Sequence, residues 1–174
     1  MSPTPPNIIL IGMPGSGKST VGVLLARQML RDFVDTDVLI QRSQGRSLQD
    51  IVDRDGYLTL RAIEERVLLG LRCRGHVIAT GGSAVYSEAA MMHLQTEGTV
   101  VFLQVSLATL RQRVRDYETR GLAKRPDQTI EGLFAERSAL YERYADITID
   151  CEGLGQEDVC RKIIAGLRSV RPRP

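Results

Sequence analysis

Short apolar runs alternate along the chain with longer segments in which apolar residues recur at helical spacing. A run of about four to seven apolar residues that ends in glycine or polar residues predicts a strand buried on both faces. Spacings of three and four predict an amphipathic helix. The predicted strands are residues 7–11, 33–35, 76–79, 99–105 and 147–149. The predicted helices are residues 17–29, a short helix opened by the capping box at 47–50, residues 58–71, 87–94, a helix capped by Ser106, and residues 130–144 and 159–167.

Strands alternate with helices in this list, which predicts βαβ units, a parallel sheet and helices on both of its faces. The chain has 174 residues, so we expect one three-layer α/β domain that spans residues 1–174. The segment 117–129 is polar and contains Gly121 and Pro126, and we expect a mobile loop there. Residues 169–174 are expected to be a frayed tail.

The segment from Gly12 to Ser19 matches the Walker A pattern G-x-x-x-x-G-K-[ST]. It follows a predicted strand and opens a predicted helix, which is the context that the motif requires. Its glycines let backbone N–H groups approach phosphate oxygens, and the helix N-terminus adds unpaired donors. We expect Lys18 to reach the β- and γ-phosphates of ATP and Ser19 to hold Mg²⁺. The expected nucleotide-binding residues here are Gly12, Pro14, Gly15, Ser16, Gly17, Lys18, Ser19 and Thr20.

Two carboxylates, Asp35 and Asp37, flank Thr36 at the end of the second predicted strand. In an extended segment they would point to the same side. One would then face the Mg²⁺ ion and the other a substrate hydroxyl. No Asn-Lys-x-Asp segment is present, which excludes a small GTPase, and an ATP-binding-cassette domain would need a serine-glycine-rich signature and a longer chain.

The amino-acid composition excludes several classes of protein. Apolar residues make up 43% and charged residues 25%, as in ordinary globular proteins, so disorder is excluded. Lys and Arg number 23 and Asp and Glu 21, so the net charge of +2 gives no general attraction for nucleic acid or an acidic membrane. The cysteines Cys73, Cys151 and Cys160 lack metal-binding spacing, and no apolar run reaches 18 residues. We expect a cytoplasmic monomer whose partner is a small-molecule substrate, without nucleic acid or membrane.

Several motifs in order resemble the shikimate kinase family over nearly the whole chain. They are GMPGSGKST (12–20), DTD (35–37), GRS-LQDI (45–51), LRAIEE (60–65), the glycine pair 81–82 and ER-x-x-LY (136–141). The resemblance implies a nucleoside-monophosphate-kinase-like P-loop fold with a five-stranded parallel sheet, a substrate-binding arm at about 35–64 and a lid at about 117–129. It also implies transfer of the ATP γ-phosphoryl group to the 3-hydroxyl of shikimate, a step of aromatic amino acid biosynthesis.

The resemblance also assigns roles to individual residues. Asp37 would bind substrate hydroxyls and act as base, and Asp35 would join the Mg²⁺ shell. Two arginines, Arg61 and Arg137, would clamp the substrate carboxylate, a task that suits the planar guanidinium fork. The remaining matches are Gly81, Gly82 and Ser83 at the substrate, Arg113 at the adenine and Arg120 as the catalytic lid arginine.

Two departures from the family pattern keep alternatives open. Ser83 stands where the family usually has a third glycine, and its side chain would crowd a ring or bond a different acceptor. In the lid, Gly121 replaces a proline after Arg120, and Lys124 and Arg125 compete for the role of Arg120. The alternatives are a kinase of the same fold for a homoserine- or gluconate-like acceptor, and a non-catalytic nucleotide-binding regulatory module.

Overall fold

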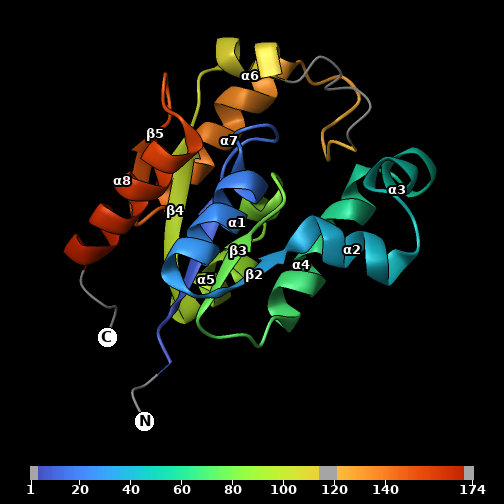
Figure 1. Cartoon of the computed structure of the whole chain (residues 1–174). Coiled ribbons are helices and arrows are strands. Elements are labelled where there is room, and N and C mark those ends of the chain that lie inside the picture. Colours follow the sequence, from blue (N-terminus) through green and yellow to red (C-terminus); the bar gives the residue numbers. More distant parts are fainter. Residues whose placement is uncertain (1–3, 114–120, 171–174) are drawn as a thin grey trace.

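Strand β1 (Asn7–Ile11) is buried along its whole length and lies at the centre of the sheet. The computed structural model describes residues 4–113 and 121–170, and in them five parallel strands are arranged in the order β2-β3-β1-β4-β5 (Figure 1). Ile8 pairs with Val77 of β3 on one side and with Thr99 of β4 on the other. The other strands are β2 (Asp32–Asp35), β3 (His76–Ala79), β4 (Gly98–Gln104) and β5 (Ile147–Asp150). All five predicted strands are confirmed, with ends within one or two residues.

Helices cover both faces of the sheet, as predicted (Figure 1). Helices α1 and α8 contact each other on one face, and α5 and α7 pack against β4 from the other. The helices are α1 (Lys18–Met29), α2 (Thr36–Gln44), α3 (Leu48–Asp55), α4 (Tyr57–Gly70), α5 (Glu88–Glu97), α6 (Leu107–Arg113), α7 (Ile130–Tyr144) and α8 (Gln156–Ser169), with a 3₁₀ turn η1 (Ala84–Tyr86). The capping box of Ser47 and Asp50 begins α3, as predicted.

Helix α2 was not predicted, and the extended segment expected through Asp37 is wrong. Strand β2 ends at Asp35, whose side chain accepts a hydrogen bond from the backbone N–H of Asp37 at 3.0 Å and so caps α2. Asp37 therefore lies in the first turn of a helix and does not share one face of a strand with Asp35. An N-cap aspartate satisfies a helix donor that would otherwise lack a partner, which is why the chain turns here.

The arm, formed by α2, α3 and α4, lies to one side of the sheet (Figure 1). Its apolar side chains form a second small core that is separate from the core around the sheet. Its buried members are Ile40, Ile51, Leu60 and Ile63, together with Ala123 from the segment after residue 120. The arm and this later segment are therefore packed together.

The described part of the predicted loop, residues 121–129, contains no helix or strand, as expected, whereas residues 117–120 lie outside the described part of the chain. Leu122 and Ala123 are buried, and Gly121 donates its N–H to Gln49 of α3. Gly121 has φ +63°, and a Cβ there would lie 2.5 Å from the carbonyl carbon of Leu48. The glycine that departs from the family pattern is therefore required by this close approach.

Among the helices of the described residues, none combines the length and the apolar character that a bilayer crossing demands.

Leu30 at the end of α1 is predicted to store backbone strain. It has φ 52° and ψ 49°, and its side chain is 95% exposed, so nothing in its packing offsets a left-handed conformation. We expect Leu30→Gly to raise the free energy of unfolding by about 0.5–1 kcal/mol, because relief of strain exceeds the added flexibility of glycine in the unfolded chain. Urea denaturation measures the change, and Leu30→Ala, which keeps a Cβ, is the control. An equal gain in both variants would trace the effect to the exposed leucine side chain instead.

Candidate active site

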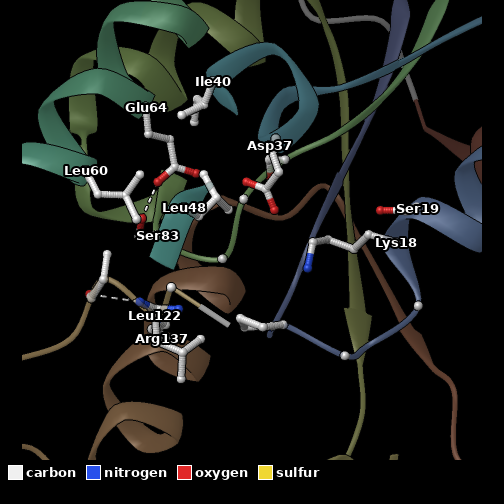
Figure 2. A pocket seen from close by; sticks show the side chains of 18 of the residues that line it. Lys18, Ser19, Asp37, Ile40, Leu48, Leu60, Glu64, Ser83, Leu122 and Arg137 are labelled. Atoms are coloured by element: carbon white, nitrogen blue, oxygen red, sulfur yellow. Dashed lines mark hydrogen bonds between the residues drawn. The ribbon is translucent and has the colours of Figure 1, made fainter. Parts of the chain in front are cut away.

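A cavity of about 510 Å³ lies at the carboxyl ends of the central strands, between the P-loop, the arm and residues 121–123 (Figure 2). In open α/β sheets ligands bind at this end, where chain connections leave the sheet in opposite directions. The lining residues are Pro14, Gly15, Gly17, Lys18, Ser19, Thr20, Asp37, Ile40, Leu48, Leu60, Glu64, Thr80, Gly81, Gly82, Ser83, Arg113, Gly121, Leu122, Ala123 and Arg137. Most of the residues predicted from motifs are thereby brought to one place.

The P-loop forms one end of the cavity. Gly12 has φ +147°, and a Cβ there would lie 2.9 Å from the carbonyl oxygen of Leu103, so only glycine fits between the loop and β4. The ammonium of Lys18 donates to the carbonyl oxygens of Gly12 at 2.8 Å and Met13 at 2.9 Å. Burial lowers the pKa of Lys18 to about 8. A buried cation whose charge is opposed by desolvation is ready to bind an anion such as phosphate.

Arg113 lines the cavity from the end of α6, whereas Gly12 and Ser16 do not line it. The hydroxyl of Ser16 is buried and has no hydrogen-bond partner in the described part of the chain.

Ser19 and Asp35 present oxygen atoms side by side. The Ser19 hydroxyl donates to Oδ2 of Asp35 at 2.6 Å. A hydroxyl and a carboxylate fit Mg²⁺, which prefers oxygen ligands and uses few protein groups when it also binds phosphates. Residues 4–113 and 121–170 contain no group of three or more His, Cys, Asp or Glu residues that could hold a metal ion.

Asp37 projects into the cavity from the first turn of α2 (Figure 2). Burial raises the pKa of this carboxyl group, and the charge of Lys18 opposes the rise. A carboxylate with a raised pKa accepts a proton more readily than one in water, so Asp37 has the chemistry of a general base.

The glycine pair after β3 brings the opposite walls of the cavity together. A Cβ on Gly81 would lie 2.2 Å from Oε1 of Glu64 and 2.7 Å from Oδ1 of Asp37. A Cβ on Gly82 would lie 2.7 Å from Cδ of Pro14. Any side chain at either position would therefore displace groups of the cavity.

The two predicted clamp arginines meet at one backbone carbonyl. Arg137 from α7 is 1% exposed and lines the cavity, and it donates to the carbonyl oxygen of Ala123 at 3.1 Å. Arg61 from α4 donates to the same oxygen at 2.9 Å. Its guanidinium lies 3.5 Å from the ring centroid of Tyr86 and lines a neighbouring cavity of about 250 Å³. Of the two predicted clamp arginines, Arg137 lines the main cavity and Arg61 does not.

The structure describes two of the three basic residues that are candidates for the lid arginine, Lys124 and Arg125. Arg120 lies outside the described residues. Lys124 donates to the carbonyl oxygen of Gln128 at 3.3 Å, and Arg125 lies 3.6 Å from the carboxylate of Glu136. Neither lines the main cavity.

Sequence analysis did not single out Glu64, which the structure places in the cavity wall. It is 3% exposed, Oε2 accepts a hydrogen bond from the Ser83 hydroxyl, and Oε1 has no partner among the described residues. Burial raises the pKa of Glu64 to about 7, and the charge of Asp37 adds to the rise. The sequence feature that could have identified Glu64 is its spacing of four residues from both Leu60 and Leu68, which puts this glutamate on the apolar side of the helix.

Comparison with known proteins finds shikimate kinases in the family model, among curated relatives and among solved structures. The family model described as shikimate kinase matches residues 14–168. A shikimate kinase of Thermodesulfovibrio yellowstonii is 37% identical over 161 residues, which cover 91% of this chain and 92% of that protein. Among solved structures, shikimate kinase from Acinetobacter baumannii in complex with shikimate has a TM-score of 0.83 at 32% identity, over 95% of this chain and 94% of that one. Shikimate kinase from Aquifex aeolicus has a TM-score of 0.81 at 36% identity, over 94% and 96%.

The buried carboxyl group of Glu64 is predicted to make stability depend on pH. Its pKa is about 7 in the folded protein and about 4.5 in the unfolded chain, so the folded state binds more protons between these values. The free energy of unfolding should fall as pH rises from about 4.5 to 7 and stay lower above 7. Glu64→Gln removes this titration and should raise stability at pH 8 by up to about 3 kcal/mol, with little gain at pH 4.5.

Urea denaturation at the two pH values measures this difference. The matched control is Glu65→Gln, because Glu65 is exposed on the same helix. A gain for Glu64→Gln that is equal at both pH values would contradict the assignment.

Proposed function

This chain belongs to the shikimate kinase family, and we propose that it transfers the γ-phosphoryl group of ATP to the 3-hydroxyl of shikimate in aromatic amino acid biosynthesis. The observation that carries the proposal is one cavity that Lys18 of the P-loop, Asp37 of α2 and Arg137 of α7 all line (Figure 2). A nucleotide and a small hydroxy acid would meet between these groups.

The P-loop would hold the nucleotide through its backbone N–H groups and through Lys18, and Arg113 would contact the adenine. Ser19 and Asp35 would hold Mg²⁺, which neutralises charge on the phosphate oxygens when bound. Lys18 already makes two of the three hydrogen bonds that an ammonium can donate, which fixes its position before a phosphate oxygen takes the third.

Asp37 and Arg137 would orient the acceptor. The guanidinium of Arg137 would bind the carboxylate of shikimate, and the carboxylate of Asp37 would accept a hydrogen bond from the reacting hydroxyl. The absence of side chains at Gly81 and Gly82 lets Asp37 and Arg137 lie close to this backbone, where they would face the acceptor.

In the reaction the acceptor oxygen forms a bond to the γ-phosphorus while the bond from that phosphorus to the bridging oxygen of ADP breaks. The hydroxyl proton passes to Asp37, whose pKa is raised by burial and therefore suits it to this task. Lys18 stabilises the charge on the phosphoryl oxygens. Leu122 and Ala123 are buried between arm and cavity, where they exclude water that would otherwise hydrolyse ATP.

Other expectations from the sequence stay predictions. They are the role of Arg120 at the transferring phosphate, the role of Arg61 at the carboxylate, the mobility of the lid, and a cytoplasmic monomer that binds neither nucleic acid nor membrane. The arm and lid as substrate-binding parts of one domain also stay a proposal, supported by the shared core of Ile40, Ile51, Leu60, Ile63 and Ala123.

A coupled assay that follows ADP release tests the function. With Mg-ATP, we expect rapid release with shikimate and only background release with homoserine or gluconate. Rapid release with either of those acceptors and background with shikimate would overturn the proposal. ATP binding without ADP release on any acceptor would favour the regulatory alternative.

Replacement of Arg137 by lysine is predicted to weaken acceptor binding selectively. A lysine offers a point charge where the arginine offers a planar fork, so the loss of one charge-assisted hydrogen bond should raise the KM for shikimate about tenfold or more. The KM for ATP should change little. Steady-state kinetics measure both values, and the control is Arg66→Lys, because Arg66 is exposed on α4. An unchanged KM for shikimate would show that Arg137 does not hold the carboxylate.

A further inference from the structure

Ser83 has a side chain where the family pattern has a glycine, and the structure gives this side chain a specific partner. Ser83 precedes the turn η1, but its hydroxyl does not cap that turn. The hydroxyl donates instead to Oε2 of Glu64 across the wall of the cavity (Figure 2). Ser83 is 7% exposed, so water does not compete freely for this bond. The hydroxyl is therefore turned toward α4, while Ser83 remains part of the cavity lining.

The second carboxylate oxygen of Glu64, Oε1, lacks a hydrogen-bond donor within the described part of the protein. Oε1 is buried and has no hydrogen-bond partner among the described residues. The space above Gly81 is bounded by this oxygen and by Oδ1 of Asp37. Two carboxylate oxygens therefore converge on the part of the cavity that the acceptor would occupy, and an unpartnered buried acceptor is unfavourable until a donor binds it.

The Ser83 hydroxyl has two physical effects on Glu64. A donor bonded to a carboxylate stabilises its charged form, whereas burial and the nearby charge of Asp37 favour the protonated form. The bond also fixes the direction of the carboxylate plane, so that Oε1 cannot turn away. The other charged or titratable groups that face Glu64 are Lys18 on α1, Arg137 on α7 and Tyr141 on α7. The two cations favour ionised Glu64, as Ser83 does.

We propose that Ser83 is a positioning residue of the acceptor site, whose hydroxyl bonds Oε2 of Glu64, favours the charged form of that carboxyl group and keeps Oε1 directed beside Asp37 over Gly81. This inference rests on the proposed function and deepens it. The chemical class of ligand that it favours is a hydroxy acid with more than one hydroxyl, because Asp37 and Glu64 then each accept from a separate hydroxyl. Glycine at position 83 would supply no such donor.

The pH profile of acceptor binding separates this role from a merely structural one. Between pH 6 and 9, the KM for shikimate of the wild type should rise toward low pH as Glu64 takes up a proton. In Ser83→Ala we expect this rise to begin about one pH unit higher, because one hydrogen bond to the charged form is lost. The KM should be several-fold higher than in the wild type at pH 6.5 and similar to it at pH 9. Ser83→Gly should behave like Ser83→Ala, and Ser83→Thr should restore the wild-type profile.

A double variant supplies the control for Glu64. In a Glu64→Gln background the acid rise is absent, and the added Ser83→Ala change should have no further pH-dependent effect. Profiles of Ser83→Ala and the wild type that superimpose would overturn the proposal. A pH-independent increase in KM for Ser83→Ala would also overturn it, because loss of packing gives that result.

A second measurement tests the effect of Ser83 on Glu64 without relying on catalytic activity. Carbon-13 NMR of the glutamate side-chain carboxyl carbons, with Glu64 assigned by Glu64→Gln, follows its titration directly. We expect Ser83→Ala to raise the midpoint by about one pH unit. If the wild type releases no ADP with shikimate, the proposed function fails while this titration still tests the action of Ser83. A midpoint that does not move shows that Ser83 does not control Glu64.

Discussion

Gly81 and Gly82 carry no side chains, and groups from separate parts of the chain occupy the space that side chains would fill. Glu64 of α4 and Asp37 of α2 close over the first glycine, and Pro14 of the P-loop and Arg137 of α7 close over the second. The Tyr141 hydroxyl on α7 also donates to the carbonyl oxygen of Gly82 at 2.6 Å. The turn after β3 thus acts as the point where the phosphate end, the arm and α7 are held in contact.

Around this turn, two cations and two anions share one buried cavity: Lys18, Arg137, Asp37 and Glu64. Burial works against the charge of Lys18, Asp37 and Glu64, and the neighbouring groups of opposite sign reduce that penalty. Burial is the largest effect on each of these three groups, so the charges remain a net cost to the folded protein in spite of their neighbours. The same unsatisfied polarity is what a charged, hydroxylated ligand relieves on binding. Affinity in this site is therefore obtained at the expense of stability, as is common in active sites.

The sequence predicted the five strands and most helices, because their apolar periodicity is clear and the P-loop lies between a strand and a helix. Helix α2 was missed because Val38, Leu39 and Ile40 form a run that fits a strand as well as a helix, and the choice is made by the Asp35 cap. The sequence motifs also identified many of the residues that line the cavity. Motif spacing did not reveal how Arg61 lies or that Glu64 belongs to the wall, because both depend on tertiary contacts between segments far apart in the chain.

The central position of β1 in the sheet also affects how the chain folds during its synthesis. β1 is synthesised before its neighbours in the sheet, β3 and β4, whose partner residues for Ile8 are Val77 and Thr99. At about 5–20 residues per second, several seconds pass before the first neighbour has been made. During that time an apolar, aggregation-prone strand has no partner. Folding of the sheet is therefore delayed until β3 and β4 have been synthesised.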